Sequence, residues 1–234
     1  MTRPTVAWVL AVTVALSALV SACGPSIDAA AKADLDQRVA ALGSRGQNFP
    51  APASAAPMPF AVGHWVTYKF VDDKGQPSLM TMKLVGQEGP DFWYEMVNES
   101  YYGKTGIRML VDFGDRQRPE SITIKAAKLR DAKGQIIEYP PAMIGMMNST
   151  LRGQLGPIVI NWNGLPQEDV SVIAGKFTGA YKGRSEVTFA GFKSSSVVWG
   201  HSAVPLSGMV RSQGDNNTTG ELVDFGTSGA RSDF

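Results

Sequence analysis

The sequence predicts a mainly β protein with an antiparallel sheet of many short strands. Three observations indicate this class. Apolar and polar residues alternate in short runs, turn-forming residues recur every 8–15 positions, and the chain contains 25 glycines and 14 prolines. Alternation with a period of two is typical of strands buried on one face. Frequent glycine and proline suit turns better than a helical bundle.

The first residues have the layout of a secretory signal peptide. Arg3 is the only charged residue before Cys23, and Val6–Leu19 is a run of 14 almost entirely apolar or small residues. Such a run is shorter than the ~20 apolar residues that a membrane-spanning helix needs. Residues 1–22 are therefore interpreted as a signal peptide that is removed.

The stretch Val20-Ser21-Ala22-Cys23 resembles a bacterial lipobox. The resemblance implies cleavage after Ala22 and a lipid such as palmitate on Cys23. An uncleaved membrane anchor and a secreted protein with a chance cysteine are the alternatives. A free thiol in an oxidising compartment is a liability, whereas lipidation explains why Cys23 is present. Gly24 follows, where inner-membrane retention in some bacteria uses aspartate, so attachment to the outer membrane facing the periplasm is favoured.

Composition limits the partners and the chemistry. The chain has 22 basic and 21 acidic residues, and because Arg3 is removed with the signal peptide the mature chain is balanced. No basic excess indicates nucleic acid, and no charge block indicates an anionic membrane surface. A single cysteine excludes an internal disulfide framework and a cysteine-based zinc site.

Residues 23–59 are expected to form a lipidated tether. A short helix over 26–42 is predicted by Ser26 or Asp28 as its cap and by Gly43 at its end. The stretch 44–59 is rich in proline, alanine and serine, a composition typical of a semi-extended spacer. Docking of the helix on the folded domain is the alternative.

The folded domain is expected to span residues 60–226, followed by a disordered tail over 227–234. Strands are predicted over 60–71, 78–85, 92–97, 107–111, 121–125, 135–139, 158–162, 170–181, 186–189, 196–199, 207–211 and 220–225. A short amphipathic helix is predicted over 141–152, where Met143, Met146 and Met147 have helical spacing.

Several stretches together resemble a loose group of secreted bacterial proteins whose architecture is similar to the lipoprotein-carrier superfamily of the Lol type. They are 62–68, 172–177, 197–199, 203–210 and 221–226. The resemblance implies a strongly curved antiparallel sheet, a half-barrel of about 10–12 strands with one or two short covering helices. It also implies that lipid or acyl chains are held on the concave face.

Methionine is abundant in the predicted domain. The candidate lining of an apolar binding site consists of Met80, Met82, Met96, Met109, Met143, Met146, Met147 and Met209. Methionine is flexible and polarisable and suits surfaces that adapt to variable apolar ligands. A helix over 141–152 would then act as a lid. The alternative is that these side chains fill an ordinary core between sheet and helix.

Motifs of enzymatic chemistry are missing from the sequence. It has two histidines, His64 and His201, in no metal-binding spacing, and it lacks a nucleophile elbow and a phosphate-binding glycine loop. We therefore expect no cofactor, no metal and no catalytic residue. The favoured function is binding of an apolar or amphiphilic ligand, or of a lipidated partner, and the alternative is a tethered protein–protein interaction module.

Overall fold

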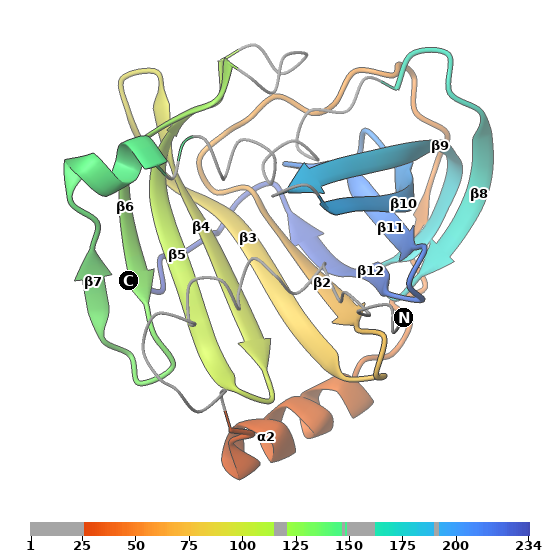
Figure 1. Cartoon of the computed structure of the whole chain (residues 1–234). Coiled ribbons are helices and arrows are strands. Elements are labelled where there is room, and N and C mark those ends of the chain that lie inside the picture. The colour runs from red at the N-terminus through yellow and green to blue at the C-terminus, as the bar shows by residue number, and fades with distance from the viewer. Residues whose placement is uncertain (1–25, 115–120, 147, 149–161, 190–191) are drawn as a thin grey trace, which may run out of the picture.

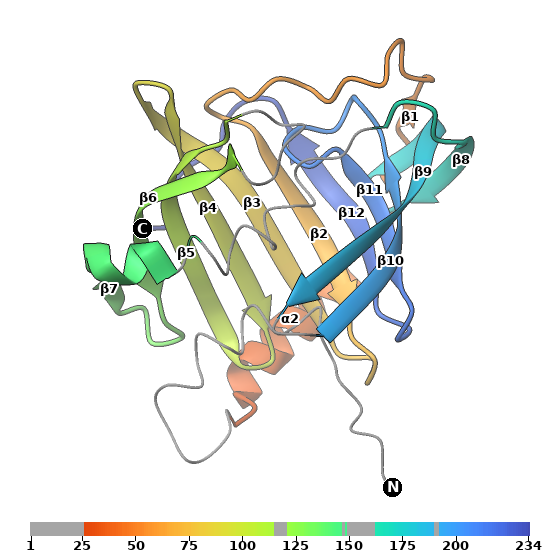
Figure 2. The same cartoon turned by 45° about the horizontal axis from the view of Figure 1, so that its top comes forward.

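The computed structural model describes residues 26–114, 121–146, 148, 162–189 and 192–234. Its main feature is one large, open, 12-stranded sheet, which curls around a concave inner face (Figures 1 and 2). The prediction of a mainly β protein with a curved antiparallel sheet is therefore confirmed.

The first half of the sheet is a meander. Its strands are β2 (Trp65–Val71), β3 (Pro77–Glu88), β4 (Asp91–Ser100), β5 (Gly103–Asp112), β6 (Thr123–Arg130) and β7 (Ile136–Glu138). Each pairs in antiparallel with the next along the chain. The alternation that predicted the strands thus leads directly to neighbouring partners.

The second half contains β8 (Gln167–Val172), β9 (Gly175–Phe189), β10 (Phe192–Gly200), β11 (Met209–Gly214) and β12 (Thr219–Gly226). Strand β12 pairs in antiparallel with β2, so the last strand joins the two halves into one sheet. Strand β7 lies at one edge, and β8 and the short β1 (Asn48–Phe49) both pair with β9 at the other.

The core lies on the inner face. Val66, Tyr68 and Leu84 are almost completely buried and belong to one hydrophobic cluster. Because side chains alternate along a strand, the intervening residues of β2 and β3, such as Thr67 and Lys83, lie on the outer face. The sheet therefore has an apolar inner face and a more polar outer face.

The single long strand predicted over 170–181 is wrong: the chain forms a hairpin there. Val172 pairs with Gly175, with a two-residue turn between β8 and β9. Gly175 has a φ of +147°, and a Cβ on it would lie 2.5 Å from the carbonyl oxygen of Gln47. The glycine permits both the tight turn and the close approach of the N-terminal segment.

Part of the predicted tether packs on the domain. Helix α2 (Ala29–Ala40) is capped by Asp28, whose carboxylate accepts hydrogen bonds from two backbone N–H groups. Its Leu35 is 2% exposed, and Arg38 forms an ion pair with Glu99 of β4. The predicted helix is confirmed, but its place in a free tether is corrected to a position against β3, β4 and β5.

The spacer after α2 is also attached to the sheet. Strand β1 runs parallel to β9, and the ring of Phe49 stacks on Phe177 with 4.4 Å between centroids. The carbonyl oxygen of Pro50 lies 3.1 Å from the Nε2 atom of His201. The segment predicted to be a semi-extended spacer is therefore attached to the sheet at Phe49 and Pro50. Phe49 is the aromatic residue that anchors it, because its ring packs on the buried Phe177.

The tail over 227–234, expected to be disordered, lies on the outer face of β3–β6. The indole N–H of Trp65 donates to Ser228 O at 3.1 Å, and Lys83 and Lys104 form ion pairs with Asp233. The prediction of disorder is wrong. The small, polar residues of the tail do not reveal that its partners lie on strands far away in the sequence.

Candidate functional site

The structure brings four predicted methionines together on the inner face, in what we call the methionine patch: Met80, Met82, Met96 and Met109. Met82 of β3 lies directly opposite Met96 of β4. Met80 is two positions from Met82, and Met109 of β5 lies opposite Tyr94. Residues two apart on a strand share a face, so the four side chains form a continuous apolar surface.

The methionine patch is only partly filled by its neighbours. Met109 is 1% exposed, whereas Met80, Met82 and Met96 are partly exposed although they lie on the core side of the sheet. Met209 of β11 also packs against this core. Thioethers at partly covered inner positions suit contact with an apolar ligand of variable shape.

The helical segment 141–146 places its methionines differently from the prediction. Ile144 is 7% exposed, whereas Met143 is 39% and Met146 is 72% exposed. At about 100° per residue, an inward Ile144 turns both of them away. The lid interpretation is therefore corrected for these two positions. Met147 and the end of the predicted helix, residues 149–152, lie outside the described residues.

Asn148 attaches this segment to β6. Its amide nitrogen donates to Ile124 O at 2.9 Å, and its amide oxygen accepts from Ile124 N at 2.6 Å. Strand β7 pairs with β6 only from Lys128 onward. The Asn148 side chain therefore supplies the hydrogen bonds that a strand would make at Ile124, and fixes the chain beside the end of β6.

Tyr94 is a buried polar residue at the border of the methionine patch. It lies opposite Leu84 on one side and Met109 on the other, and it is 1% exposed. Its buried hydroxyl has no hydrogen-bond partner among the described residues. Burial, with the nearby Tyr68, raises the pKa of Tyr94 above its usual value, so the hydroxyl stays protonated and can donate.

Tyr68 of β2 provides a comparison, separated from Tyr94 by β3. Its hydroxyl lies 2.9 Å from the Oγ atom of Ser207 and donates to the carbonyl oxygen of Met209 at 2.9 Å. Burial raises the pKa of Tyr68. One phenol is thus satisfied by the protein and the other is not, and an unpaired buried hydroxyl is costly unless a ligand or water completes it.

Sequence reasoning did not identify Tyr94. A signal was present, because Phe92, Tyr94 and Met96 are spaced two apart in a predicted strand and must share a face. A phenol among apolar residues on a half-buried strand is a candidate for a directed hydrogen bond. What the sequence does not show is which of the inner-face phenols finds a partner across the sheet.

Aromatic rings border Tyr94 on one side. Phe113 lies edge-on to Tyr94 with 5.9 Å between centroids, and Phe60 packs on Phe113 at 4.3 Å. Phe92 approaches both phenylalanines at just over 6 Å. The methionine patch therefore continues into an aromatic cluster.

Both histidines lie in structural surroundings. The Nδ1 atom of His201 accepts from Ala203 N at 3.1 Å, so Nε2 carries the proton and faces Pro50 O. Burial lowers the pKa of both His64 and His201, and in His201 it outweighs the hydrogen bonds that favour the charged form. Within the described part of the chain, no group of acidic, histidine or cysteine side chains is arranged to hold a metal ion.

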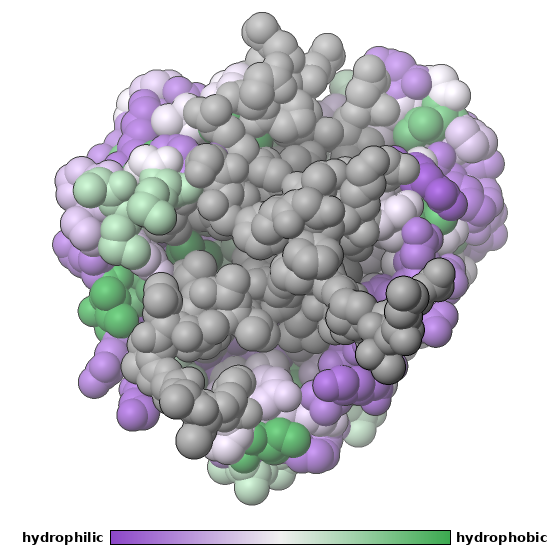
Figure 3. Space-filling model, in the orientation of Figure 1, coloured by the Kyte–Doolittle hydropathy of each residue, from purple (hydrophilic) through white to green (hydrophobic). Residues whose placement is uncertain are grey.

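A second apolar surface lies at the β7 edge. Ile136 and Ile137 are each about half exposed, and Met143 and Met146 follow in the helical segment. Figure 3 shows hydrophobic surface over β7 and this segment, at the left of the view. Two adjacent strand residues exposed on both faces are unusual, because alternation normally buries one of them.

Cys23, the expected lipidation site, lies outside the described residues. None of the helices that the structure describes is long and apolar enough to cross a membrane.

No known protein family matches the chain, and no curated protein matches it. One solved structure is similar: a Bacteroides fragilis protein described as a "putative exported protein with YmcC-like fold". The two are 15% identical, the match covers 74% of this chain and 100% of the other, and the TM-score is 0.38. A similarity at this level identifies neither the Lol-type superfamily nor a function.

Proposed function

We propose that this chain is a non-enzymatic lipoprotein of the bacterial envelope that binds an apolar or amphiphilic ligand, or the acyl chains of a lipidated partner, on its inner face. The observation that carries the proposal is the Tyr94 hydroxyl beside the methionine patch, which is buried and has no hydrogen-bond partner in the part of the chain that the structure describes. Apolar side chains there would bury an alkyl chain, and the hydroxyl would donate to a polar atom of the ligand.

The energetics of such a site are set mainly by the alkyl chain. Each buried methylene contributes ~0.8 kcal/mol, or about fourfold in affinity. The hydrogen bond from Tyr94 would add about 0.5–1.5 kcal/mol. Affinity for a series of fatty acids should therefore rise steeply with chain length until the patch is covered, and the head group should add a smaller, constant increment.

Native mass spectrometry of the full chain, purified in detergent from a bacterial envelope, tests this proposal. We expect a co-purifying lipid, and we expect Met82→Lys to remove it by placing a charge in the patch. Met146→Lys is the matched control, because that methionine is exposed and the same change there should leave the lipid bound. Equal loss in both variants, or no lipid and no fatty-acid binding in the unmodified chain, would contradict the proposal.

Two conservative variants separate ligand binding from folding. Tyr94→Phe should weaken binding of a fatty acid about two- to tenfold, whereas Tyr68→Phe, whose hydroxyl is already paired, should leave binding unchanged. Isothermal titration with a soluble fatty acid measures both. Equal affinities for all three proteins would remove Tyr94 from the site.

The proposed address is the periplasmic side of the outer membrane, reached through lipid on Cys23. The lipobox-like stretch and Gly24 support it. Labelling cells with a palmitate analogue should tag the unmodified chain but not Cys23→Ser, and membrane fractionation should place the tagged protein with the outer membrane. An unlabelled chain would leave a secreted ligand-binding protein, and inner-membrane recovery would correct the address alone.

The apolar surface at the β7 edge supports a second candidate, a tethered protein–protein interaction module. Ile136 and Ile137 lie on an edge strand, where unpaired backbone groups can accept a strand from a partner. A photo-crosslinking amino acid at Ile137 should capture a single envelope protein, while the same probe at the exposed polar Lys133 should not. Identical patterns from both positions would reject this candidate.

A further inference from the structure

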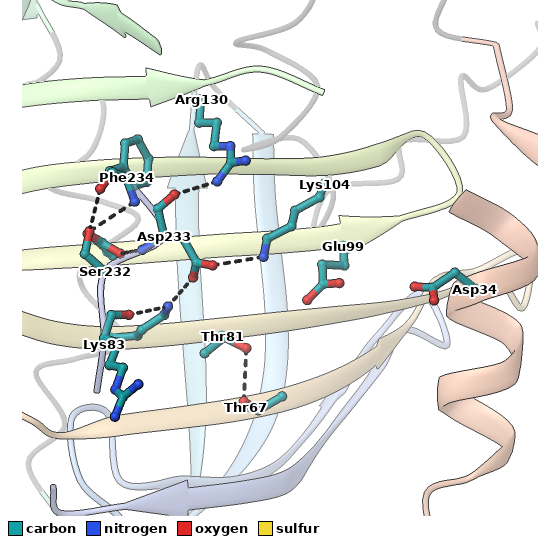
Figure 4. A network of polar contacts seen from close by, with 12 residues as sticks. Asp34, Thr67, Thr81, Lys83, Glu99, Lys104, Arg130, Ser232, Asp233 and Phe234 are labelled. Carbon is teal, nitrogen blue, oxygen red and sulfur yellow. Dashed lines mark hydrogen bonds and ion pairs between the residues drawn. The ribbon is translucent and has the colours of Figure 1, made fainter. Parts of the chain in front are cut away.

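The outer face of β3–β6 carries a second candidate binding site, separate from the methionine patch. Residues 231–234 lie across these strands and are held by side chains from each of them (Figure 4). We call the sheet residues involved the outer-face site: Lys83 of β3, Glu95 of β4, Lys104 and Gly106 of β5, and Arg130 of β6.

Two lysines and an arginine hold Asp233. Lys104 Nζ donates to Asp233 Oδ1 at 3.0 Å, and Lys83 Nζ donates to Oδ2. Arg130 Nη1 donates to the backbone carbonyl oxygen of Asp233 at 2.5 Å. Burial acts to raise the pKa of this carboxyl, but the two lysines outweigh it and hold the pKa below the usual range.

Glu95 binds Ser232, the residue before Asp233, and the backbone N–H of Asp233. It is fully buried, its Oε1 atom accepts from the Ser232 hydroxyl at 2.5 Å, and its Oε2 atom accepts from Asp233 N at 3.0 Å. Among the described residues, both hydrogen bonds of this carboxylate come from the segment it binds. The Nε atom of Arg108 lies 3.7 Å away and balances the charge.

A glycine makes room for the aromatic ring. A Cβ on Gly106 would lie 3.2 Å from the Cε2 atom of Phe234, so the ring rests directly on the β5 backbone. The adjacent β5 residues point to the inner face, and the apolar Val97 of β4 lies opposite Gly106. Serine, aspartate and phenylalanine are thus each contacted by a different part of the outer-face site.

The bound segment lies outside the strands of the sheet, so its release would break no strand pairing. Residues 227–234 are not part of any strand, and residues 227–229 are exposed. Gly229 has a φ of +86° with nothing within 4 Å of a Cβ. Lys83 and Glu95, however, are buried charges whose hydrogen bonds among the described residues go to the segment. Buried charges are costly to keep and often serve specificity rather than stability.

We propose that the outer-face site is a peptide-recognition site for the order serine, acidic residue, aromatic residue. Residues 231–234 are its built-in occupant, and a partner protein carrying the same order in an exposed segment displaces them. The recognition is chemical: buried Glu95 selects a hydroxyl and a backbone N–H, two lysines select a carboxylate, and Gly106 admits a ring. This inference does not depend on a ligand on the inner face.

Tethering explains how the site is kept closed. A segment joined to its site by a short linker competes at an effective concentration of about millimolar or more. A free peptide of the same sequence therefore binds the unmodified chain weakly. Once the occupant is weakened, the same peptide should bind with its full affinity, which gives a direct test.

The experiment measures fluorescence anisotropy of a labelled peptide, Gly-Ala-Arg-Ser-Asp-Phe, on the full chain in detergent. The double variant Asp233→Ala, Phe234→Ala should bind it at least tenfold more tightly than the unmodified chain. A control peptide with asparagine in place of aspartate should bind the variant at least tenfold more weakly, because it loses both lysine contacts. Adding Lys83→Met to the variant should reduce binding of the aspartate peptide to the level of the control.

Equal binding of the peptide to the unmodified and variant chains would overturn the proposal, and so would equal binding of the two peptides or binding weaker than millimolar throughout. Circular dichroism and a thermal melt check that the variant folds. If it does not, the isosteric Asp233→Asn chain repeats the comparison. The same expectations and the same overturning results apply to that chain.

Discussion

At the scale of single residues, the two inner-face tyrosines show what sequence reasoning can and cannot reach. Alternation along β2 and β4 predicts that Tyr68 and Tyr94 face inward, and both do. Their hydrogen bonding depends instead on β11 and the loop before it, where Ser207 and Met209 reach only Tyr68. The methionine patch was predictable for the same reason, whereas the lack of a partner for the Tyr94 hydroxyl among the described residues was not.

The difference in hydrogen bonding predicts that removing the hydroxyl changes the free energy of unfolding more at Tyr68 than at Tyr94. Tyr68→Phe should lower the free energy of unfolding by about 1–2 kcal/mol, because it leaves buried partners without a donor. Tyr94→Phe should leave the free energy of unfolding unchanged or raise it slightly, since it removes a buried hydroxyl that has no partner among the described residues. Urea denaturation of the two delipidated variants measures both. Equal losses would mean that Tyr94 has a partner in solution.

At the scale of elements, prediction succeeded where partners are close in sequence. The hairpins from β2 to β6 and from β9 to β10 follow from alternation and turn residues. It failed at residues 170–181, because a run of β-branched residues through Val172 and Ile173 conceals a two-residue turn. The turn depends on Gly175 and on the closeness of Gln47, a contact between distant parts of the chain.

The β8–β9 hairpin provides a matched test of that closeness. Gly175→Ala should lower the free energy of unfolding by more than ~2 kcal/mol, because its Cβ would lie 2.5 Å from Gln47 O and its φ is positive. Gly164→Ala has only the positive φ, with no atom within 4 Å, and should cost about 1 kcal/mol. Thermal or urea unfolding measures the loss of stability in both variants. Similar losses would show that the backbone at Gln47 moves away from residue 175 at little energetic cost.

At the scale of the whole molecule, both segments outside the predicted domain are structural. The N-terminal segment pairs with β9 and places Pro50 against His201, and the tail lies across β3–β6. Local composition could not show this, since prolines, alanines and serines suggest a spacer wherever they occur. Leu35 and Phe49 are among the few residues of these segments that pack on the domain. The sequence does not identify them, because the surfaces that bury them are formed by distant strands.

Burial of His201 makes this arrangement sensitive to pH, because it outweighs the hydrogen bond to Pro50 O, which favours the charged ring. Burial lowers the pKa of His201 in the folded chain, so between that pKa and about 6.5 the unfolded chain binds more protons. Stability therefore rises with pH through this window and is lost as the pH falls below about 6.5. The unfolding midpoint should decrease from pH 7.5 to 5.5.

His201→Gln should flatten this dependence without abolishing it, because burial lowers the pKa of His64 in the same direction. Urea midpoints at several pH values measure the slope, and an NMR titration of the His201 ring gives its pKa directly. A slope unchanged by the substitution would assign the effect to other groups.

The pairing of β2 with β12 has a consequence for how the chain is made and moved. Strand β2 can pair with β3 as soon as β3 has been synthesised. Its other neighbour, β12, is made only after nearly every described residue. Contacts between remote segments form slowly. For the export proposed above, this delay would keep the chain unfolded long enough to pass through a narrow channel in the membrane.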